Sequence, residues 1–121
     1  MKDLIKTRTK KVGLEVFKLM DEFPNKPSSW AVARQIVRSA TSIGANYRAA
    51  CRAKSTADFI YKLKIVEEET DETLYWIEIL EEGGIVPSEK LSILKTEVNE
   101  ILSIVVASIK TARKNQNNPK S

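Results

Sequence analysis

The chain contains no histidine and only one cysteine, Cys51, among its 121 residues. The absence of histidine excludes Ser-His catalytic triads, histidine acid–base catalysis and histidine metal ligands. A single thiol excludes an internal disulfide and a thiolate zinc cluster. With no histidine to activate it, Cys51 is expected to be a small core residue rather than a nucleophile.

Long hydrophobic runs are also lacking. Apolar runs such as residues 104–107 are far too short to span a bilayer, so we expect no membrane association. The N-terminal residues carry no long apolar segment, so no secretory signal is expected. The default expectation is therefore a cytoplasmic protein. With only four glycines and four prolines, the chain has few points at which a helix must break.

Charge is distributed unevenly along the chain, although its net value is only +4. Residues 1–54 hold 12 Lys and Arg against 4 Asp and Glu, whereas residues 55–109 hold 4 basic and 12 acidic side chains. Residues 110–121 add four basic side chains and no acidic one. A basic half, an acidic half and a basic tail can pair with each other or present separate faces to partners.

Helical periodicity predicts two helices in the first half of the chain. The first covers about residues 3–22, and the two prolines in residues 23–29 end it. The second is expected to start with Ser28 or Ser29 as its N-cap and to reach about Lys54. Gly44, inside this second helix, would permit close approach of a neighbouring helix. The inward stripes of the two helices are Ile5, Val12, Val16, Leu19 and Phe23, then Ala33, Ile36, Ala40, Ile43, Tyr47 and Ala50.

Two further helices follow in the second half. Residues 55–58 have the pattern of a capping box, and Gly83-Gly84 supplies a left-handed C-terminal turn. Ser88 is the expected N-cap of the last helix, which frays near Lys114. The inward residues are Phe59, Leu63, Val66, Thr70, Thr73, Ile77 and Leu80, then Leu91, Leu94, Val98, Ile101, Val105, Ser108 and Ala112.

These elements predict an all-α protein, an antiparallel up-and-down four-helix bundle. A single domain covers residues 1–114, and residues 115–121 form a flexible polar tail. A second apolar set lies off the main stripes, and it indicates either a thick monomeric core or, as we prefer, self-association through an extra face. That set comprises Leu14, Phe17, Met20, Trp30, Val37, Ile65, Trp76, Ile79, Leu102, Ile104 and Val106.

The candidate binding residues are basic side chains of the second helix. Arg34, Arg38, Arg48 and Arg52 fall within one narrow helical stripe, which Lys54 extends, and Arg113 and Lys114 follow in the last helix. Arginine grips phosphate with a bidentate fork, so the stripe could follow a nucleic-acid backbone.

The alternative is that these arginines form ion pairs with the acidic third helix. A hairpin that turns at residues 54–55 places Arg38 level with Asp71, and Arg34 level with Tyr75. We therefore expect Arg34 and Arg38 to be salt-bridged, within or between subunits. Arg48, Arg52 and Lys54 lie beyond the main acidic run and are expected to be freer.

Other candidate sites have simpler structural explanations. The acidic run has no recognisable metal-ligand spacing, so we expect solvated or ion-paired faces, no metal and no cofactor. Asn46 is expected to be a buried polar residue that needs partners. The aromatic residues Trp30, Tyr47, Tyr61, Tyr75 and Trp76 could stack on bases, but helical spacing favours core or interface positions.

Residues 34–87 resemble the 23S rRNA intervening-sequence proteins, often called four helix bundle proteins. The segments that carry the resemblance are Ser42-Ile43-Gly44-Ala45-Asn46-Tyr47, residues 48–55, 58–60 and 62–63, and residues 66–80. Many members of the family have Ala-Glu-Gly at the position of residues 48–50, where this chain has Arg-Ala-Ala. No role built on that glutamate therefore carries over.

The resemblance implies a four-helix up-and-down subunit that assembles into a homopentamer. It also implies RNA or DNA binding by analogy, with no established catalytic activity and no residue-level site. The prediction is a non-enzymatic bundle that binds nucleic acid through Arg48, Arg52 and Lys54, with contributions from Arg34, Arg38, Arg113 and Lys114. The alternative is a scaffold whose partner is a protein, without a nucleic-acid ligand. No small-molecule substrate is indicated.

Overall fold

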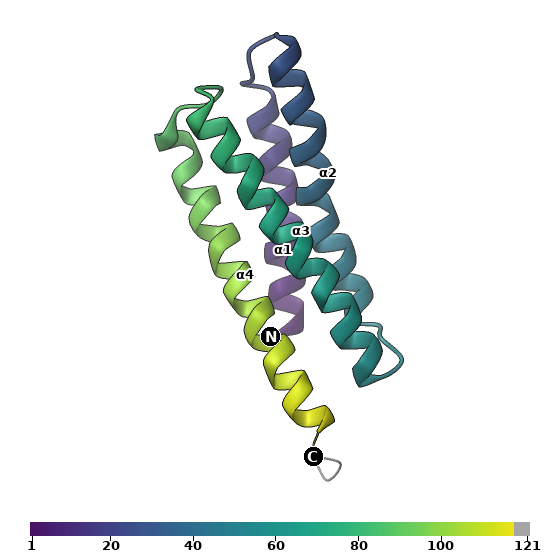
Figure 1. Ribbon diagram of the computed structural model, residues 1–121. Helices are drawn as coiled ribbons and strands as arrows, with labels where there is room; N and C mark the ends of the chain where they lie inside the picture. Colours follow the sequence, from purple (N-terminus) through teal and green to yellow (C-terminus); the bar gives the residue numbers. More distant parts are fainter. Residues whose placement is uncertain (118–121) are drawn as a thin grey trace.

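A computed structural model describes residues 1–117, and within this range the chain forms four helices that pack side by side (Figure 1). The helices are α1 (Lys2–Met20), α2 (Pro27–Ala50), α3 (Thr56–Glu82) and α4 (Ser88–Gln116). Each helix packs on the next along the chain, and α1 packs less extensively on α4. The predicted all-α, up-and-down four-helix bundle is confirmed. The start of α1, the α2–α3 loop and the end of α4 lie at the same end of the bundle.

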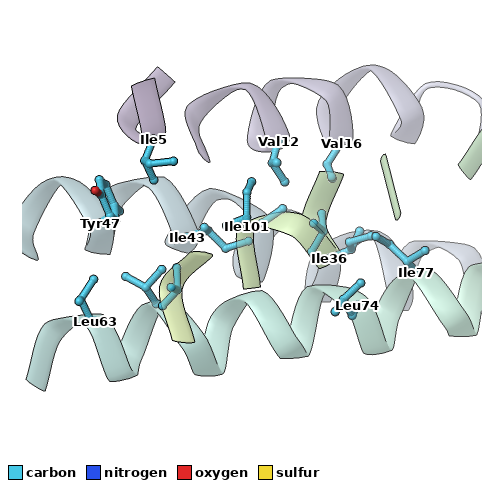
Figure 2. Close-up of a cluster of buried hydrophobic side chains, with 14 of the residues drawn as sticks. Ile5, Val12, Val16, Ile36, Ile43, Tyr47, Leu63, Leu74, Ile77 and Ile101 are labelled. Carbon is cyan, nitrogen blue, oxygen red and sulfur yellow. The ribbon is translucent and has the colours of Figure 1, made fainter. Parts of the chain in front are cut away.

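The inward stripes predicted from the sequence form one core between the helices (Figure 2). Ile36, Ile43 and Leu63 are fully buried, and most other predicted positions are buried too. The exceptions are half-buried: Phe23, Ala33, Phe59, Leu94 and Ser108. Among residues 1–117, no helix is long and apolar enough to cross a membrane.

Polar side chains inside this core are hydrogen-bonded. Thr73 Oγ1 lies 2.9 Å from Ser39 Oγ on α2 and 2.8 Å from the carbonyl oxygen of Glu69. Thr70 Oγ1 donates to the carbonyl oxygen of Val66. Among the described residues, no buried side-chain nitrogen or oxygen lacks a partner. The core therefore accepts these hydroxyl groups without the cost of an unsatisfied polar atom.

The helices α1 and α2 approach each other backbone to backbone at a glycine. A Cβ atom on Gly44 would lie 3.2 Å from the nitrogen of Lys10 and 3.3 Å from the carbonyl carbon of Thr9. On α1, a Cβ atom on Gly13 would lie 3.5 Å from the Cα of Thr41. The predicted role of Gly44 in close helix packing is confirmed.

The start of α2 and the start of α4 differ from the predictions. Pro27 is the first residue of α2 and Lys26 is its N-cap, so the serines at 28–29 lie inside the helix. Ser88 is the first residue of α4, and Pro87 is its N-cap. The predicted serine caps are therefore wrong. Proline suits the first helical position because its fixed φ is helical and it has no N–H to leave unpaired.

Both predicted ends of α3 are confirmed. The N–H of Asp58 donates to Ser55 Oγ at 3.1 Å, which caps the helix start. At the other end, Gly84 has a φ of 68°, which only glycine adopts without strain. The N–H of Ile85 then donates to the carbonyl oxygen of Leu80 at 2.9 Å, as in a Schellman motif.

Two C-terminal boundaries also differ. Helix α2 ends at Ala50, before the expected boundary at Lys54, so Arg52 lies in the α2–α3 loop. Helix α4 continues to Gln116, past the expected end of the domain at residue 114. The rest of the predicted tail, residues 118–121, lies outside the described part of the chain.

The least packed seam of the bundle lies between α1 and α4. Arg8 donates to both carboxylate oxygens of Glu97, at 2.6 and 2.9 Å, and lies 3.0 Å from Glu100. The pair with Arg8 lowers the pKa of Glu97 and raises that of Arg8. Next to this pair is a groove of about 760 Å³ whose lining includes Leu19 and Ile93. Arg8 was not identified from the sequence.

Several members of the predicted second apolar set remain at the surface. Phe17 on α1 is 47% exposed, and Leu14 and Trp30 are similarly exposed. The other members of the set are half-buried. Ile93, which was not in that set, is 84% exposed at the rim of the α1–α4 groove. The bundle thus leaves apolar side chains on both flanks of α1.

Gly44→Val is expected to lower the free energy of unfolding by about 2–4 kcal/mol, because a branched side chain would push into the backbone of α1. Ala45→Val is the matched control, since Ala45 is exposed on the same helix and should lose less than about 1 kcal/mol. Urea unfolding of both variants measures the difference. Equal losses would contradict the proposed backbone contact.

Glu97→Gln is expected to reduce the acid sensitivity of folding. Since the folded-state pKa of Glu97 is lowered, the ion pair stabilises the fold above the ordinary pKa of 4.5, and this contribution is lost as the pH falls through the lowered pKa. The difference in free energy of unfolding between wild type and variant should therefore shrink as the pH falls from about 7 to about 3. Glu89→Gln serves as the control for loss of a carboxylate outside the seam. A difference that does not change with pH would refute this role for the pair.

Candidate nucleic-acid interface

The antiparallel fold gathers basic side chains from three distant parts of the chain at one end of the bundle. We define this cationic end as residues 1–7, 47–64 and 106–117, which are the start of α1, the α2–α3 loop with its flanking turns, and the end of α4 (Figure 1). It holds ten Lys and Arg against two Asp and Glu, a net charge of +8.

Both carboxylates of the cationic end are already paired. Asp3 lies 3.8 Å from Lys6 on α1, and Asp58 lies 3.0 Å from Lys62 on α3. The pKa of Asp58 is lowered by its hydrogen bond from Lys62 and by the backbone N–H of Lys54. Within residues 1–117, the other eight basic side chains of this end are exposed and have no carboxylate at ion-pair distance. They are Lys2, Arg48, Arg52, Lys54, Lys64, Lys110, Arg113 and Lys114.

The start of α1 and the α2–α3 loop form a continuous surface within the cationic end. Lys2, Lys54 and Cys51 line the same shallow pocket of about 280 Å³. The Nζ of Lys2 lies 5.2 Å from the ring centre of Phe59, which also lines this pocket. This cation–π contact holds the ammonium group of Lys2 beside the α2–α3 loop, which carries Lys54.

Three of these basic residues also have a local structural role. Arg48 lies in the last turn of α2, and Arg113 and Lys114 lie in the last turn of α4. Cations at a helix C-terminus are stabilised by the helix dipole, each by about 0.3–1 kcal/mol. Their positions are therefore favourable for folding before any ligand is bound.

Helix α2 carries three of the four arginines of the predicted stripe, and two of these three, Arg38 and Arg48, lean toward different neighbouring helices. Gly44 faces α1, so Arg48, one turn later, lies on the α1 flank of the helix. Arg38 reaches instead toward α3. Arg52 lies past the end of α2, because the helix stops at Ala50. The predicted placement of Arg52 on α2 is therefore wrong.

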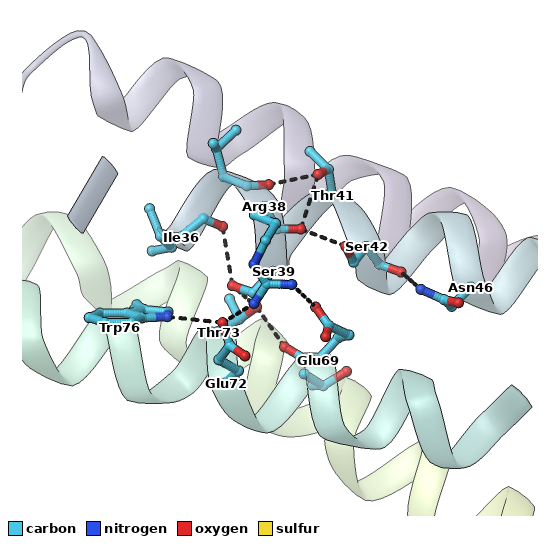
Figure 3. A network of polar contacts seen from close by, with 12 residues as sticks. Ile36, Arg38, Ser39, Thr41, Ser42, Asn46, Glu69, Glu72, Thr73 and Trp76 are labelled. Carbon is cyan, nitrogen blue, oxygen red and sulfur yellow. Dashed lines mark hydrogen bonds and ion pairs between the residues drawn. The ribbon is translucent and has the colours of Figure 1, made fainter. Parts of the chain in front are cut away.

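Arg38 is salt-bridged to α3, as the sequence predicts. Its partners lie on either side of Asp71, the residue expected to be level with it. It lies 3.0 Å from Glu69 and also pairs with Glu72 (Figure 3). These contacts raise the pKa of Arg38, mainly through the hydrogen bond to Glu72. Trp76 Nε1 donates to the same Glu72 carboxylate at 3.2 Å. Arg38 is thus neutralised by carboxylates of its own chain.

Arg34 differs from Arg38. It is exposed in the N-terminal half of α2, away from the cationic end, and no carboxylate of residues 1–117 lies at ion-pair distance. The expected ion pair within the subunit is therefore not seen for Arg34 in the described chain. The candidate residues that come together are Arg48, Arg52, Lys54, Arg113 and Lys114.

The remaining candidates have structural explanations. Asn46 is half-buried and donates to the carbonyl oxygen of Ser42 at 2.8 Å. Cys51 is half-buried at the end of α2. Burial, together with the nearby Cys51, raises the pKa of Tyr47 to about 12. Among the described residues, no group of three or more potential ligand side chains is placed to hold a metal ion.

The aromatic residues divide by burial. Tyr47 is buried in the core, and Trp76 is half-buried with its ring 5.0 Å from that of Tyr75, edge to face. Trp30 donates to Asn25 at the opposite end of the bundle. Of the five aromatic residues considered from the sequence, Tyr61 is the one that is exposed within the cationic end.

Both the sequence and the fold of this chain match known proteins. A model of the 23S rRNA-intervening sequence protein family matches residues 2–107, nearly all of the four helices. This chain belongs to that family. The resemblance seen in the sequence is therefore confirmed. A search of curated proteins gives no significant match.

A relative of this 23S rRNA-intervening sequence protein has been solved by crystallography. It is a protein of unknown function from the S23 ribosomal protein family of Bacteroides thetaiotaomicron VPI-5482, determined at 1.70 Å resolution. The two chains are 34% identical, with a TM-score of 0.83 over 91% of this chain and 99% of the other. The function of that relative is unknown.

Proposed function

We propose that this protein is a non-enzymatic nucleic-acid-binding subunit that contacts phosphates through the cationic end. The observation that carries the proposal is the gathering there of eight exposed basic side chains without carboxylate partners in the described chain. Such an array binds a polyanion by releasing its condensed counterions, so the affinity falls steeply with salt and depends little on sequence.

The candidate residues differ in what they would contribute. Arg48, Arg52 and Lys54 lie at the α2 side of the cationic end, and Arg113 and Lys114 extend it along α4. Contributions from Arg34 and Arg38 are expected to be smaller. Arg38 would have to give up its two carboxylate partners, and Arg34 lies outside the cationic end.

We also propose that the subunit forms a ring, and the family resemblance implies five copies. A closed ring with more than two copies uses two different surfaces of each subunit, one on each side. The bundle exposes apolar side chains on both flanks of α1. Phe17 lies one turn after Gly13, which contacts α2, and Ile93 lies at the α1–α4 groove. A ring would present several cationic ends to one strand and strengthen a weak site through avidity.

Arg48→Glu/Arg52→Glu is expected to weaken binding of a single-stranded RNA at least tenfold at about 50 mM salt, because both substitutions place like charge against phosphate. The slope of log affinity against log salt should fall by about 2. Fluorescence anisotropy with a labelled strand measures both quantities.

Lys18→Glu/Lys26→Glu is the matched control, since it changes the charge by the same amount at the opposite end of the bundle. It should bind within about twofold of wild type. An equal loss in both variants would contradict a localised site and indicate a dependence on net charge. Wild-type protein that does not bind at low salt would contradict the proposal and favour the protein scaffold.

Phe17→Glu and Ile93→Glu are each expected to convert the assembly to a monomer, because each removes one of the two surfaces of a ring contact. Mixing the two variants should restore one intact interface and produce a heterodimer that cannot grow further. Sedimentation velocity distinguishes these species. A mixture that stays monomeric, or a single variant that keeps the wild-type mass, would contradict this arrangement.

A further inference from the structure

Tyr61 is an aromatic side chain that the fold leaves exposed within the cationic end. It is 65% exposed on α3, in the second turn after the α2–α3 loop. Within residues 1–117, no other ring stacks on it and its hydroxyl has no hydrogen-bond partner. The ring is therefore available to a ligand.

The surroundings of Tyr61 are mainly basic, since the carboxylate of Asp58, one turn before it, is already paired with Lys62. Ile60 and Leu63 face the core, so Tyr61 and Lys64 lie together on the outer face of α3, one turn apart. The loop just before α3 carries Arg52 and Lys54. Phosphates held by these side chains would bring the bases of the same strand within reach of the ring.

Tyr75 lies on the same outer face of α3 in the opposite electrostatic surroundings. It is 52% exposed, and its neighbours one turn away are Asp71 and Glu78. These carboxylates have no basic partner at ion-pair distance in the described chain, so they would repel a phosphate backbone. The two tyrosines therefore form a natural pair of test site and control.

We infer that the cationic end binds single-stranded nucleic acid, with one base stacked on Tyr61; this rests on the proposed function. In a duplex, each base is already stacked between its neighbours and its face is not accessible. An unpaired strand has accessible base faces, and any base can stack on a tyrosine ring, so the contact is compatible with sequence-tolerant binding.

The test compares Tyr61→Leu, Tyr61→Phe and Tyr75→Leu by fluorescence anisotropy. The probes are an oligothymidine of about 12 nucleotides, the duplex that it forms with oligoadenine, and an abasic strand of the same length. Tyr61→Leu should lower the affinity for oligothymidine about tenfold and leave binding of the duplex and the abasic strand within twofold. Tyr61→Phe and Tyr75→Leu should bind like wild type.

The outcomes separate this inference from the proposed function. If wild-type protein binds no probe in a salt-dependent manner, the proposed function itself fails. If wild type binds and Tyr61→Leu binds oligothymidine with the same affinity, the stacking contact is overturned. The proposed binding through the cationic end is then retained. An equal loss for oligothymidine and the abasic strand would overturn stacking too, since the abasic strand has no base to stack.

Discussion

The contact between α1 and α2 at Gly44 determines where the surface charges lie. With no side chain at this position, the backbone of α1 at Thr9 and Lys10 rests directly on α2. Because helices are stiff, this contact and the one at Gly13 align the residues of α1 with those of α2 along the whole pair. Lys2, two turns before Lys10, then comes to lie beside Lys54 in a shared pocket. The packing of α1 on α2 in the core therefore also fixes the positions of the basic side chains on the surface.

The two ends of the bundle differ in how their charged side chains form ion pairs. Away from the cationic end, most ion pairs of the described chain join different elements, and the exception is Lys18 with Glu15 within α1. The pairs between elements are Arg38 with Glu69 and Glu72, Arg8 with Glu97 and Glu100, Lys90 with Glu22, and Lys95 with Glu81. At the cationic end, the two ion pairs of the described chain each stay within one helix. The remaining like charges repel one another and reduce the stability of the fold, a cost that a bound polyanion would remove.

The sequence predicted the core well because burial follows the helical repeat. Even Thr70 and Thr73, which are polar, were predicted to be inward by their spacing and are fully buried. The starts of α2 and α4 were predicted less well. At α2, Pro27 takes the first helical position, since its fixed φ is already suited to a helix start. At α4, Pro87 takes the N-cap position, so Ser88 becomes the first residue of the helix.

The candidate site could be predicted only in part. Arg38 was expected to pair with α3 because hairpin register is a local property of two consecutive helices. The contact of Arg8 with Glu97 joins the first helix to the last, and no periodicity in the sequence predicts it. Similarly, counting charge along the chain gives a basic half and an acidic half. Only the folded topology shows that residues 1–7, 47–64 and 106–117 form one basic surface.

The positions of Met1 and Asn117 have a practical consequence for handling the protein. Both lie at the end of the bundle that carries the unpaired cations (Figure 1). An affinity tag or fluorescent domain fused at either position would lie close to that surface and would block the access of a binding partner. The glycine turn between α3 and α4, with Gly84 exposed at the far end, is a better place for a label or a surface tether. Immobilised there, the molecule would present its basic pole outward.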